Sequence, residues 1–382
     1  MSFRYAAGIN KPGFNPLAAQ TSTTYYNLYS WGSSNYGQLG LGNTTAYSSP
    51  KAVGSLTDWL QVSTGYATSA SIKTDGTLWT WGNNIYGQLG LGTTTYYSSP
   101  KQVGALTTWK QVSTSSYGNN QPMTAAIKTD GTLWAWGRNF YGSLGLGNTT
   151  NYSSPKQVGA LTNWLNVQTG GNWAMAIKTN GTLWGWGGNG FGQLGFNNTT
   201  NYSSPKQIGA LTNWATIAIP ASNPVFVLGV KTDGTLWSWG GNPYGQLGLG
   251  NTTYYSSPKQ VGALTNWSKA TNGGNYFSLA TKTDGTLWSW GVNASGQLGL
   301  GNTTYYSSPK QVGSSTNWSV AFAGRNNVAS IKTDGTLWVW GANSSGQLGL
   351  GNTTSYSSPK QLGALNQWLT AAAGFYTVLA LG

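Results

Sequence analysis

Few side chains in this sequence could do acid–base or metal chemistry. The 382 residues include six Asp but no Glu, His or Cys. General acid–base catalysis needs a group whose pKa can be brought near the working pH, and protein metal sites use His, Cys or clustered carboxylates. Five of the Asp share one place in a repeated turn: Asp75, Asp130, Asp233, Asp284 and Asp334. We therefore predict turn-forming carboxylates, no enzyme activity, no metal and no cofactor.

The composition favours a folded chain with an ample core. Of the residues, 38% are hydrophobic and 14% aromatic. Without Cys there can be no disulfide, so cysteine usage says nothing about the compartment. The sequence has no apolar stretch long enough for a membrane span, and its N-terminus lacks the apolar core of a signal peptide. We expect a protein that does not insert into a membrane.

The net charge of +13 is spread over the chain by a repeat. One Lys follows Ser-Ser-Pro in each copy: Lys51, Lys101, Lys156, Lys206, Lys259, Lys310 and Lys360. Nucleic-acid sites normally gather Lys and Arg on one helix or stripe. A dilute basic ring predicts loose attraction to an anionic surface and makes a nucleic-acid partner the less favoured hypothesis.

A Trp-Gly pair marks seven copies of a repeat of about fifty residues. The pairs begin at Trp31, Trp81, Trp136, Trp186, Trp239, Trp290 and Trp340. In one copy, strands are expected at 101–103, 109–113, 124–128 and 132–136, with a hairpin turn at Thr129-Asp130-Gly131. Four antiparallel strands repeated seven times predict an all-β, seven-bladed propeller over residues 25–382.

The two ends of the repeat region predict how the ring closes. The Lys-Thr-Asp/Asn-Gly-Thr-Leu-Trp hairpin occurs six times, and the seventh copy is missing. Residues 25–31 are expected to form a fourth strand without partners, and residues 375–381 a third strand with nothing after it. Pairing them would complete the seventh blade in a 3+1 arrangement and remove two exposed sheet edges.

The repeat resembles a known family at this point. The segment Trp81-Gly-Asn-Asn-Ile-Tyr-Gly-Gln-Leu-Gly-Leu-Gly92, followed by a Pro and a Val, is similar to the repeat of the regulator of chromosome condensation. The similarity recurs seven times over residues 25–382 and implies a seven-bladed propeller. The family's usual His before the third strand is replaced here by Thr68, Met123, Trp173, Phe226, Phe277, Asn327 and Thr377. The nucleotide-exchange activity of eukaryotic members on a small GTPase is therefore not carried over.

Strand parity places the loops on two faces. The long Gly-rich loops, the Ser-Ser-Pro-Lys ring and the turns between the second and third strands are expected on one face, the loop face. The Asp-Gly turns are expected on the other, the turn face, beside the N-terminal arm. The turns between the second and third strands vary most between copies, which is typical of a binding surface on a rigid scaffold. Relaxed packing near the axis would explain the same variation.

These variable turns supply the candidate recognition residues. They are Tyr66, Tyr117, Asn119, Trp173, Asn223, Phe226, Tyr276, Phe277, Arg325 and Phe375. Twenty of the 21 Trp recur with the repeat and are expected to pack between blades. Trp173 is the extra one and the best candidate for stacking on a sugar or a partner. A Tyr precedes Ser-Ser-Pro in every copy, as at Tyr97, where packing under the loop and ligand contact are both possible.

Residues 1–24 precede the repeats and are predicted to be a docking arm. The candidate docking residues are Arg4, Tyr5, Lys11 and Phe14. Over about twenty residues the arm resembles N-terminal segments of tailed-phage virion proteins, especially those of marine cyanobacterial phages. Our leading hypothesis is a virion structural protein, a tail or head fibre component, made in the host cytoplasm. Its arm would bind other virion proteins, and its loop face a host-surface glycan or protein.

Two alternatives belong to other functional classes. One is a free lectin-like or inhibitor-type binding module, for which the arm would be dispensable. The other is a chromatin- or GTPase-binding regulator, for which the Lys ring would give salt-sensitive DNA binding.

Overall fold

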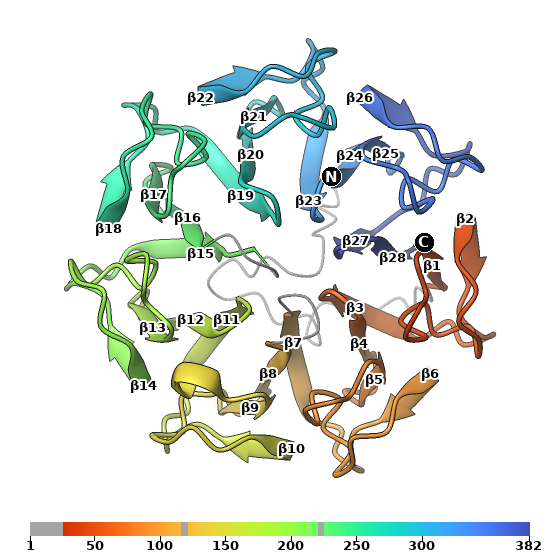
Figure 1. The fold of residues 1–382 in the computed structure, drawn as a ribbon, viewed down its shortest axis with the longest axis vertical. Helices are drawn as coiled ribbons and strands as arrows, with labels where there is room; N and C mark the ends of the chain where they lie inside the picture. Colours follow the sequence, from red (N-terminus) through yellow and green to blue (C-terminus); the bar gives the residue numbers. More distant parts are fainter. Residues whose placement is uncertain (1–25, 116–120, 221–224) are drawn as a thin grey trace.

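The chain forms a ring of seven blades in a computed structural model that describes residues 26–115, 121–220 and 225–382 (Figure 1). Each blade is a four-stranded antiparallel sheet, and the strands of each sheet follow one another outward from the axis. The predicted seven-bladed propeller is confirmed.

Six blades each use four consecutive strands, which run in chain order from the axis to the rim. The first three are β3 (Trp59–Thr64), β4 (Thr68–Lys73), β5 (Leu78–Gly82) and β6 (Tyr97–Gln102); β7 (Trp109–Ser115), β8 (Met123–Lys128), β9 (Leu133–Gly137) and β10 (Tyr152–Gln157); and β11 (Trp164–Thr169), β12 (Trp173–Lys178), β13 (Leu183–Gly187) and β14 (Tyr202–Gln207). The next three are β15 (Trp214–Ala218), β16 (Phe226–Lys231), β17 (Leu236–Gly240) and β18 (Tyr255–Gln260); β19 (Trp267–Gly273), β20 (Phe277–Lys282), β21 (Leu287–Gly291) and β22 (Tyr306–Gln311); and β23 (Trp318–Ala323), β24 (Asn327–Lys332), β25 (Leu337–Gly341) and β26 (Tyr356–Gln361). A short 3₁₀ helix, η1 (Phe140–Gly142), lies in the loop after β9.

The seventh blade joins the two ends of the propeller. Its order is β27 (Thr370–Ala373), β28 (Thr377–Leu381), β1 (Leu28–Gly32) and β2 (Tyr47–Ala52). β1 pairs antiparallel with β28, from Leu28 opposite Leu381 to Gly32 opposite Thr377. The predicted pairing of the two ends is confirmed, but the blade has two strands from each end, rather than 3+1.

The difference comes from the Ser-Ser-Pro-Lys strand. We expected it to begin a repeat unit, whereas β2 pairs with β1 and forms the outer edge of the blade that precedes it. Pro lacks a backbone N–H and is tolerated on an edge strand, and an exposed Lys discourages pairing with another sheet. Both residues therefore suit the outermost position.

The core lies between neighbouring blades and is built around the Trp of each Trp-Gly pair. Trp186 is fully buried and meets Trp164 edge-on, with ring centroids 6.3 Å apart. Its indole Nε1 donates a hydrogen bond to the backbone oxygen of Ser143, in the long loop of the preceding blade, at 2.9 Å. All seven copies make this inter-blade bond. In the seam blade, Trp31 bonds the oxygen of Gln347 at 3.0 Å and so links the first strand to the last complete blade.

Six of the repeated Trp are less buried than predicted. These are the Trp two residues before each pair from the second copy onward, and they are half-exposed because alternate residues of a strand face opposite ways. At Trp134, the Lys128 Nζ lies 3.8 Å from the ring centroid, and it lies 5.1 Å from the centroid of the buried Trp109. A lysine thus covers the exposed ring by a cation–π contact.

The Asp turns confirm the expected structural role. The Asp130 carboxylate accepts hydrogen bonds from the Thr132 backbone N at 2.9 Å and hydroxyl at 2.7 Å. The same pair of bonds lowers the pKa of Asp130, Asp233, Asp284 and Asp334, with the Thr hydroxyl as the largest cause. Asn180 accepts the equivalent bonds at 3.2 and 2.7 Å without a charge.

We predict an acid-dependent loss of stability from these turns. A carboxyl whose folded pKa is lowered stabilises the protein above the unfolded value of about 3.9, and this contribution is lost as the pH falls through the folded value. The urea midpoint of the wild type should fall between about pH 4.5 and 2. A variant with all four Asp changed to Asn should lose less over the same range, since Asn180 shows that Asn fits the turn. The fall in the urea midpoint is measured within each protein between the two pH values. An equal fall in both proteins would contradict a stabilising role of the Asp carboxylates.

Candidate functional site

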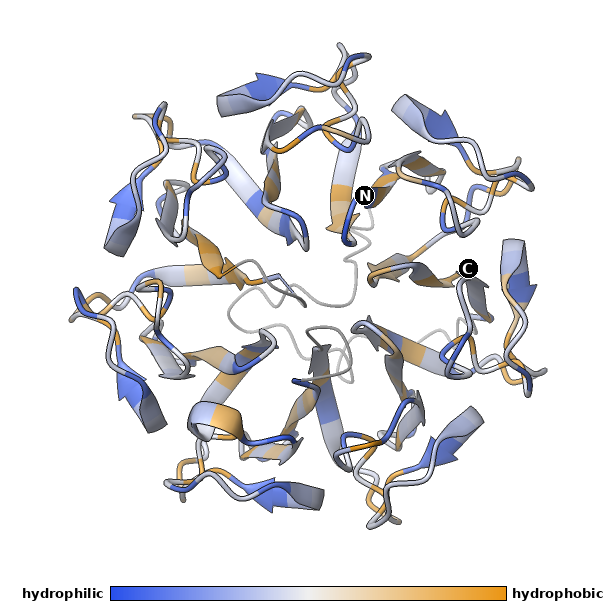
Figure 2. Cartoon of the chain, viewed as in Figure 1, coloured by the Kyte–Doolittle hydropathy of each residue, from blue (hydrophilic) through white to orange (hydrophobic). Residues whose placement is uncertain are grey.

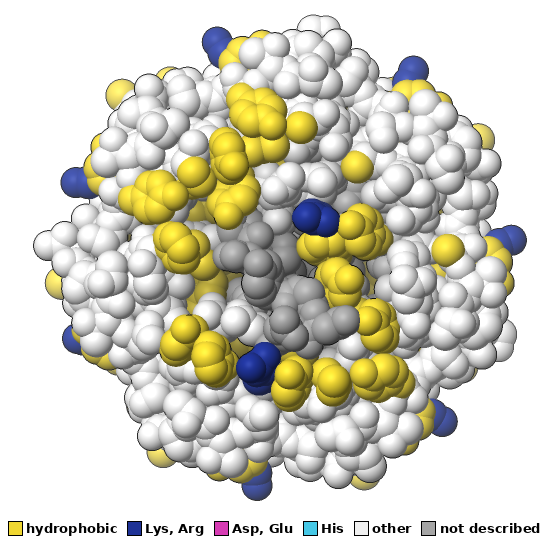
Figure 3. Space-filling view, viewed as in Figure 1, with side chains coloured by type: hydrophobic (Ala, Val, Ile, Leu, Met, Phe, Trp, Pro, Cys, Tyr) yellow, Lys and Arg dark blue, Asp and Glu magenta, His cyan; other side chains and the backbone are white. Residues whose placement is uncertain are grey.

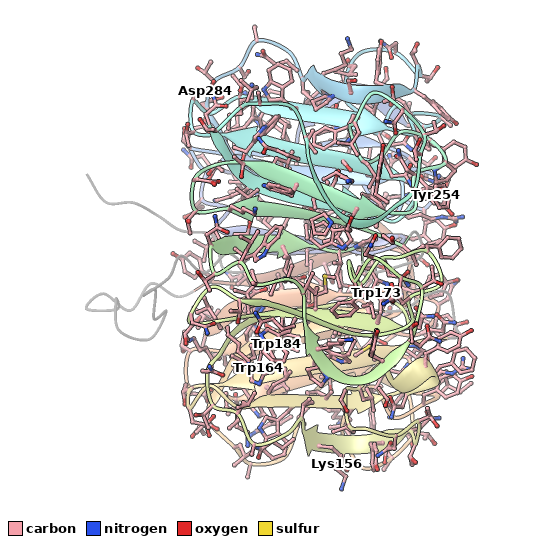
Figure 4. The ribbon with its side chains drawn as sticks, turned by 90° about the vertical axis from the view of Figure 1, so that its left-hand side faces the viewer. Lys156, Trp164, Trp173, Trp184, Tyr254 and Asp284 are labelled. Carbon is pink, nitrogen blue, oxygen red and sulfur yellow. The ribbon has the colours of Figure 1, made fainter. Side chains whose placement is uncertain are left out.

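The two faces of the ring differ in charge. Asp284 lies at one face and Tyr254 at the other (Figure 4). The described Asp residues lie in the Asp-Gly turns or, for Asp58, just before β3, where it forms a salt bridge with Lys73 at 3.4 Å. Figure 3 looks onto the loop face, where no acidic side chain is visible among the residues described, whereas basic and hydrophobic side chains lie around the axis. The long loops and the Asp-Gly turns lie on opposite faces, as predicted, but the predicted place of the Ser-Ser-Pro-Lys ring on the loop face was wrong.

Four of the predicted recognition residues lie half-exposed on the loop face: Tyr66, Tyr276, Arg325 and Phe375. Tyr117, Asn119 and Asn223 lie outside the described residues, as do the predicted arm residues Arg4, Tyr5, Lys11 and Phe14.

The prediction was wrong for Trp173, Phe226 and Phe277. Trp173 is 1% exposed, and both Phe side chains are fully buried. Each is the first residue of the second strand of its blade, and its ring points into a core cluster. Trp173 is therefore not free to stack on a sugar. We had placed these residues in one slot just before the predicted third strand, together with Thr68 and Met123, and the structure buries those two as well.

The basic ring lies at the rim and not on the loop face. Its seven Lys are exposed, and each lies near the end of an outer strand, as Lys51 does in β2 opposite Ser30 of β1. Figure 3 shows basic side chains spaced around the outer edge of the disc. The Tyr before Ser-Ser-Pro is half-buried, and the Lys lies over it, with Lys101 Nζ 5.4 Å from the Tyr97 ring centroid. Strand parity had correctly placed the start of this strand at the loop face. The Lys lies near the other end of the strand, away from that face.

Residues from three blades meet on the loop face beside the seam. The Arg325 guanidinium lies 4.1 Å from the Phe375 ring centroid, and its Nη1 donates to the Tyr376 hydroxyl at 2.9 Å. Tyr66 meets Phe375 edge-on at 4.7 Å. Burial raises the pKa of Tyr66. A Tyr phenol is protonated at neutral pH and can donate a hydrogen bond. We call Tyr66, Arg325, Phe375 and Tyr376 the seam cluster.

The inner strands surround a central channel of about 190 Å³. On one side, polar side chains link neighbouring blades, as where Gln61 Nε2 donates to the Val112 oxygen at 3.3 Å. On the opposite side the lining includes Ile217, Phe322 and several Ala, which appear as orange inner strands in Figure 2. Lys269 also lines the channel, and its ammonium donates to the Ser319 oxygen at 3.2 Å. The channel thus holds no acid–base pair among the described residues.

A second group on the loop face was missed by the sequence reasoning. Arg138 lies between Tyr86 and Phe140, with its Cζ 4.7 and 5.1 Å from their ring centroids. These residues come from the long loops, which supplied none of the predicted recognition residues. The available signal was that the third loop alone combines Arg, Phe and Tyr.

Comparisons with known proteins identify the family. A model described as the RCC1-like domain matches residues 120–380, and the regulator of chromosome condensation repeat matches residues 27–72 and 75–119. The chain belongs to the RCC1-like family. It is 28% identical to the ultraviolet-B receptor UVR8 of Arabidopsis thaliana over 190 residues, which are 50% of this chain and 32% of that one. It is 43% identical to mouse protein RCC2 over 77 residues, or 20% and 15% of the two chains.

Solved structures share the fold of this RCC1-like protein at low identity. Human WBSCR16 matches with a TM-score of 0.81 and 20% identity, over 94% of this chain and 98% of the other. Prp20p of Saccharomyces cerevisiae matches with a TM-score of 0.82 and 18% identity, over 94% of this chain and 92% of the other. The chain spans about a third or less of the length of the curated relatives named above.

The similarity to these relatives shows the family and the fold, and the virion hypothesis and its two alternatives stay predictions. Within the described ranges, no group of three or more His, Cys, Asp or Glu could hold a metal ion. No helix in the described part is long and apolar enough to cross a membrane.

Proposed function

We propose that this RCC1-like propeller is a non-catalytic binding module that recognises an acidic surface of a partner protein through its loop face. The seam cluster carries the proposal. It combines a half-exposed Arg with three aromatic side chains, and these residue types dominate the energetics of protein interfaces.

The charge of the loop face supports an acidic partner. Arg138 and Arg325 lie there, and the described Asp residues lie on the opposite side of the ring. A face with one sign of charge attracts a complementary surface and repels a like one. The Arg325 guanidinium is held in place by Phe375 and Tyr376, so less side-chain freedom is lost when a partner binds.

A similar fold is known to bind proteins. The reported structures of Prp20p concern its binding to Gsp1p and histones, and a complex with Kap60. Those partners belong to that protein, but they support protein recognition as the general use of such a ring.

The proposal is tested by comparing two variants with the wild type. The face variant carries Tyr66→Ser, Arg325→Gln and Phe375→Ser, and the rim control carries Lys101→Gln, Lys206→Gln and Lys310→Gln. Proteins retained from an extract of the producing cells are identified, purified and titrated against each form. We expect at least a tenfold loss of affinity in the face variant, and little change in the rim control at physiological salt. Equal affinity for all three forms would refute the proposal.

The same proteins separate the regulator alternative from a purely protein-binding role. Salt-sensitive DNA binding that weakens in the rim control would support a chromatin-type regulator, because Lys–phosphate contacts make binding strongly dependent on salt. DNA binding that is absent from the wild type would exclude it.

Attachment to a virus particle is the second candidate. It rests on the sequence of the arm and on a composition without His or Cys. Mass spectrometry of purified particles tests it directly. A variant lacking residues 1–24 should be lost from particles while its propeller keeps the wild-type circular dichroism spectrum. Normal incorporation of that variant would contradict the predicted role of the arm.

A further inference from the structure

One long loop departs from the other six at several positions. In those six loops a Gln precedes the Leu-Gly pair: Gln38, Gln88, Gln193, Gln246, Gln297 and Gln347. In each, Oε1 accepts a hydrogen bond from the backbone N two residues earlier, at 2.9 to 3.1 Å. The third loop has Ser143 instead, and the shorter Ser hydroxyl bonds the Arg138 oxygen at 3.2 Å.

The backbone of the third loop changes with this residue. Tyr141 adopts a left-handed conformation, with φ of 59°, whereas its described counterparts in the other loops do not have positive φ. A non-glycine residue is strained in this region, and such strain is concentrated at functional sites. The Tyr141 ring lies 4.2 Å from the Phe140 ring, centroid to centroid, and both residues are 42% exposed.

Two hollows meet at Tyr141. One has a volume of about 410 Å³ and is lined by Tyr86, Arg138, Phe140, Tyr141, Thr149 and Asn151. The other, of about 290 Å³, is also lined by Tyr141, together with amide side chains such as Asn172 and Asn201. Ligand sites commonly have volumes in this range and combine aromatic walls with a few polar groups.

Arg138 is the charged group of the first hollow. It stacks with Tyr86 and Phe140, and its guanidinium has no hydrogen-bond or salt-bridge partner among the described residues. Arg325, by contrast, donates to Tyr376. The other loops lack an Arg here and have Ser33, Asn83, Gly188, Gly241, Val292 and Ala342. Stacking fixes the plane of Arg138 and leaves its N–H edge free for a planar anion such as a carboxylate.

The geometry points to a saccharide site at Tyr141 whose ligand is a pyranose bearing a carboxylate. Sugar C–H groups carry partial positive charge and pack on the negative faces of aromatic rings, which Phe140 and Tyr141 expose. The carboxylate would bind Arg138. Sugar hydroxyls would bind Thr149 and Asn151, whose Oδ1 already accepts from the Asn139 backbone N while its Nδ2 stays available. This site is separate from the seam cluster and does not depend on it.

Calorimetric titration with trigalacturonic acid, and with a neutral galactose trimer as its control, tests the site. We expect the acidic trimer to bind the wild type with a Kd below about 1 mM, and the neutral trimer at least tenfold more weakly. Arg138→Gln should weaken binding of the acidic trimer at least tenfold. Arg325→Gln removes the other Arg of the loop face, which lies in the seam cluster outside this site, and should leave binding of the acidic trimer unchanged.

Ser143→Gln tests the origin of the site while it keeps the Arg138 side chain. It restores the Gln of the other six loops, so Tyr141 should return to their conformation and affinity should fall at least fivefold, with a thermal midpoint equal to or above that of the wild type. The site is refuted if the acidic trimer does not bind, if the neutral trimer binds equally, or if Arg325→Gln has the same effect as Arg138→Gln. Loss of partner protein in Arg325→Gln with saccharide binding retained would separate this site from the proposed protein-binding function.

Discussion

Replacing Trp31 by Ala should open the ring at its seam. Trp31 is fully buried, packs against Trp368 with centroids 6.3 Å apart, and donates to the Gln347 oxygen. Removing a buried Trp typically costs about 3–5 kcal/mol. The seam blade has no covalent link between β1 and β28, so part of this cost should appear as local opening. We expect a large fall in the urea midpoint, and fast hydrogen exchange in β1 and β28 before the other blades exchange.

Trp186→Ala is the matched control. Trp186 is equally buried and makes the same type of inter-blade bond, to Ser143, but its blade consists of consecutive strands. It should lose similar stability without selective exchange at the seam. Trp31→Phe keeps most of the packing and loses the hydrogen bond, so it should cost less, about 1–3 kcal/mol. If β1 and β28 exchange no faster in Trp31→Ala than in Trp186→Ala, the seam is not the weak point of the ring.

The fold could be predicted because its determinants are local and repeated. The Trp-Gly pair, the Asp-Gly turn and the Gly-rich loop recur in all or most of the seven repeats and form the same local structure each time. The missing hairpin shows where the two ends of the chain meet. The membership of the Ser-Ser-Pro-Lys strand was harder to predict. An edge strand is a strand with a hydrogen-bonded neighbour on one side only. The sequence does not show directly to which blade such a strand belongs.

The site could be predicted only in part because exposure at a turn depends on a shift of one residue. Tyr66 and Phe375 lie in their turns and are half-exposed, whereas Trp173 begins the following strand and is buried. The Arg138 group was missed for another reason. Tyr86 and Arg138 belong to loops of successive blades, and their contact depends on how those blades pack.

Replacing Gly234 by Ala should be among the most damaging changes of a single methyl group. Gly234 has φ of 77°, and a Cβ there would lie 2.0 Å from the Thr265 oxygen in the next blade. The left-handed backbone costs about 1–2 kcal/mol for Ala, and overpacking adds about 1–3 kcal/mol. The contact is with backbone, so no side chain can rotate away. The Gly234 oxygen also accepts from the Trp267 backbone N at 3.0 Å, and a shift of the turn would weaken this inter-blade bond.

Gly209→Ala separates the two causes. Gly209 has φ of 61°, but a Cβ there meets nothing within 4 Å. Gly209→Ala should therefore lower the free energy of unfolding only by the cost of the left-handed backbone, about 1 kcal/mol. For Gly234→Ala we expect a loss of about 3 kcal/mol or more. The difference in free energy of unfolding, measured by urea denaturation, is then the cost of pushing one blade away from the next. Equal losses at the two positions would mean that the Asp-Gly turns do not hold neighbouring blades in register.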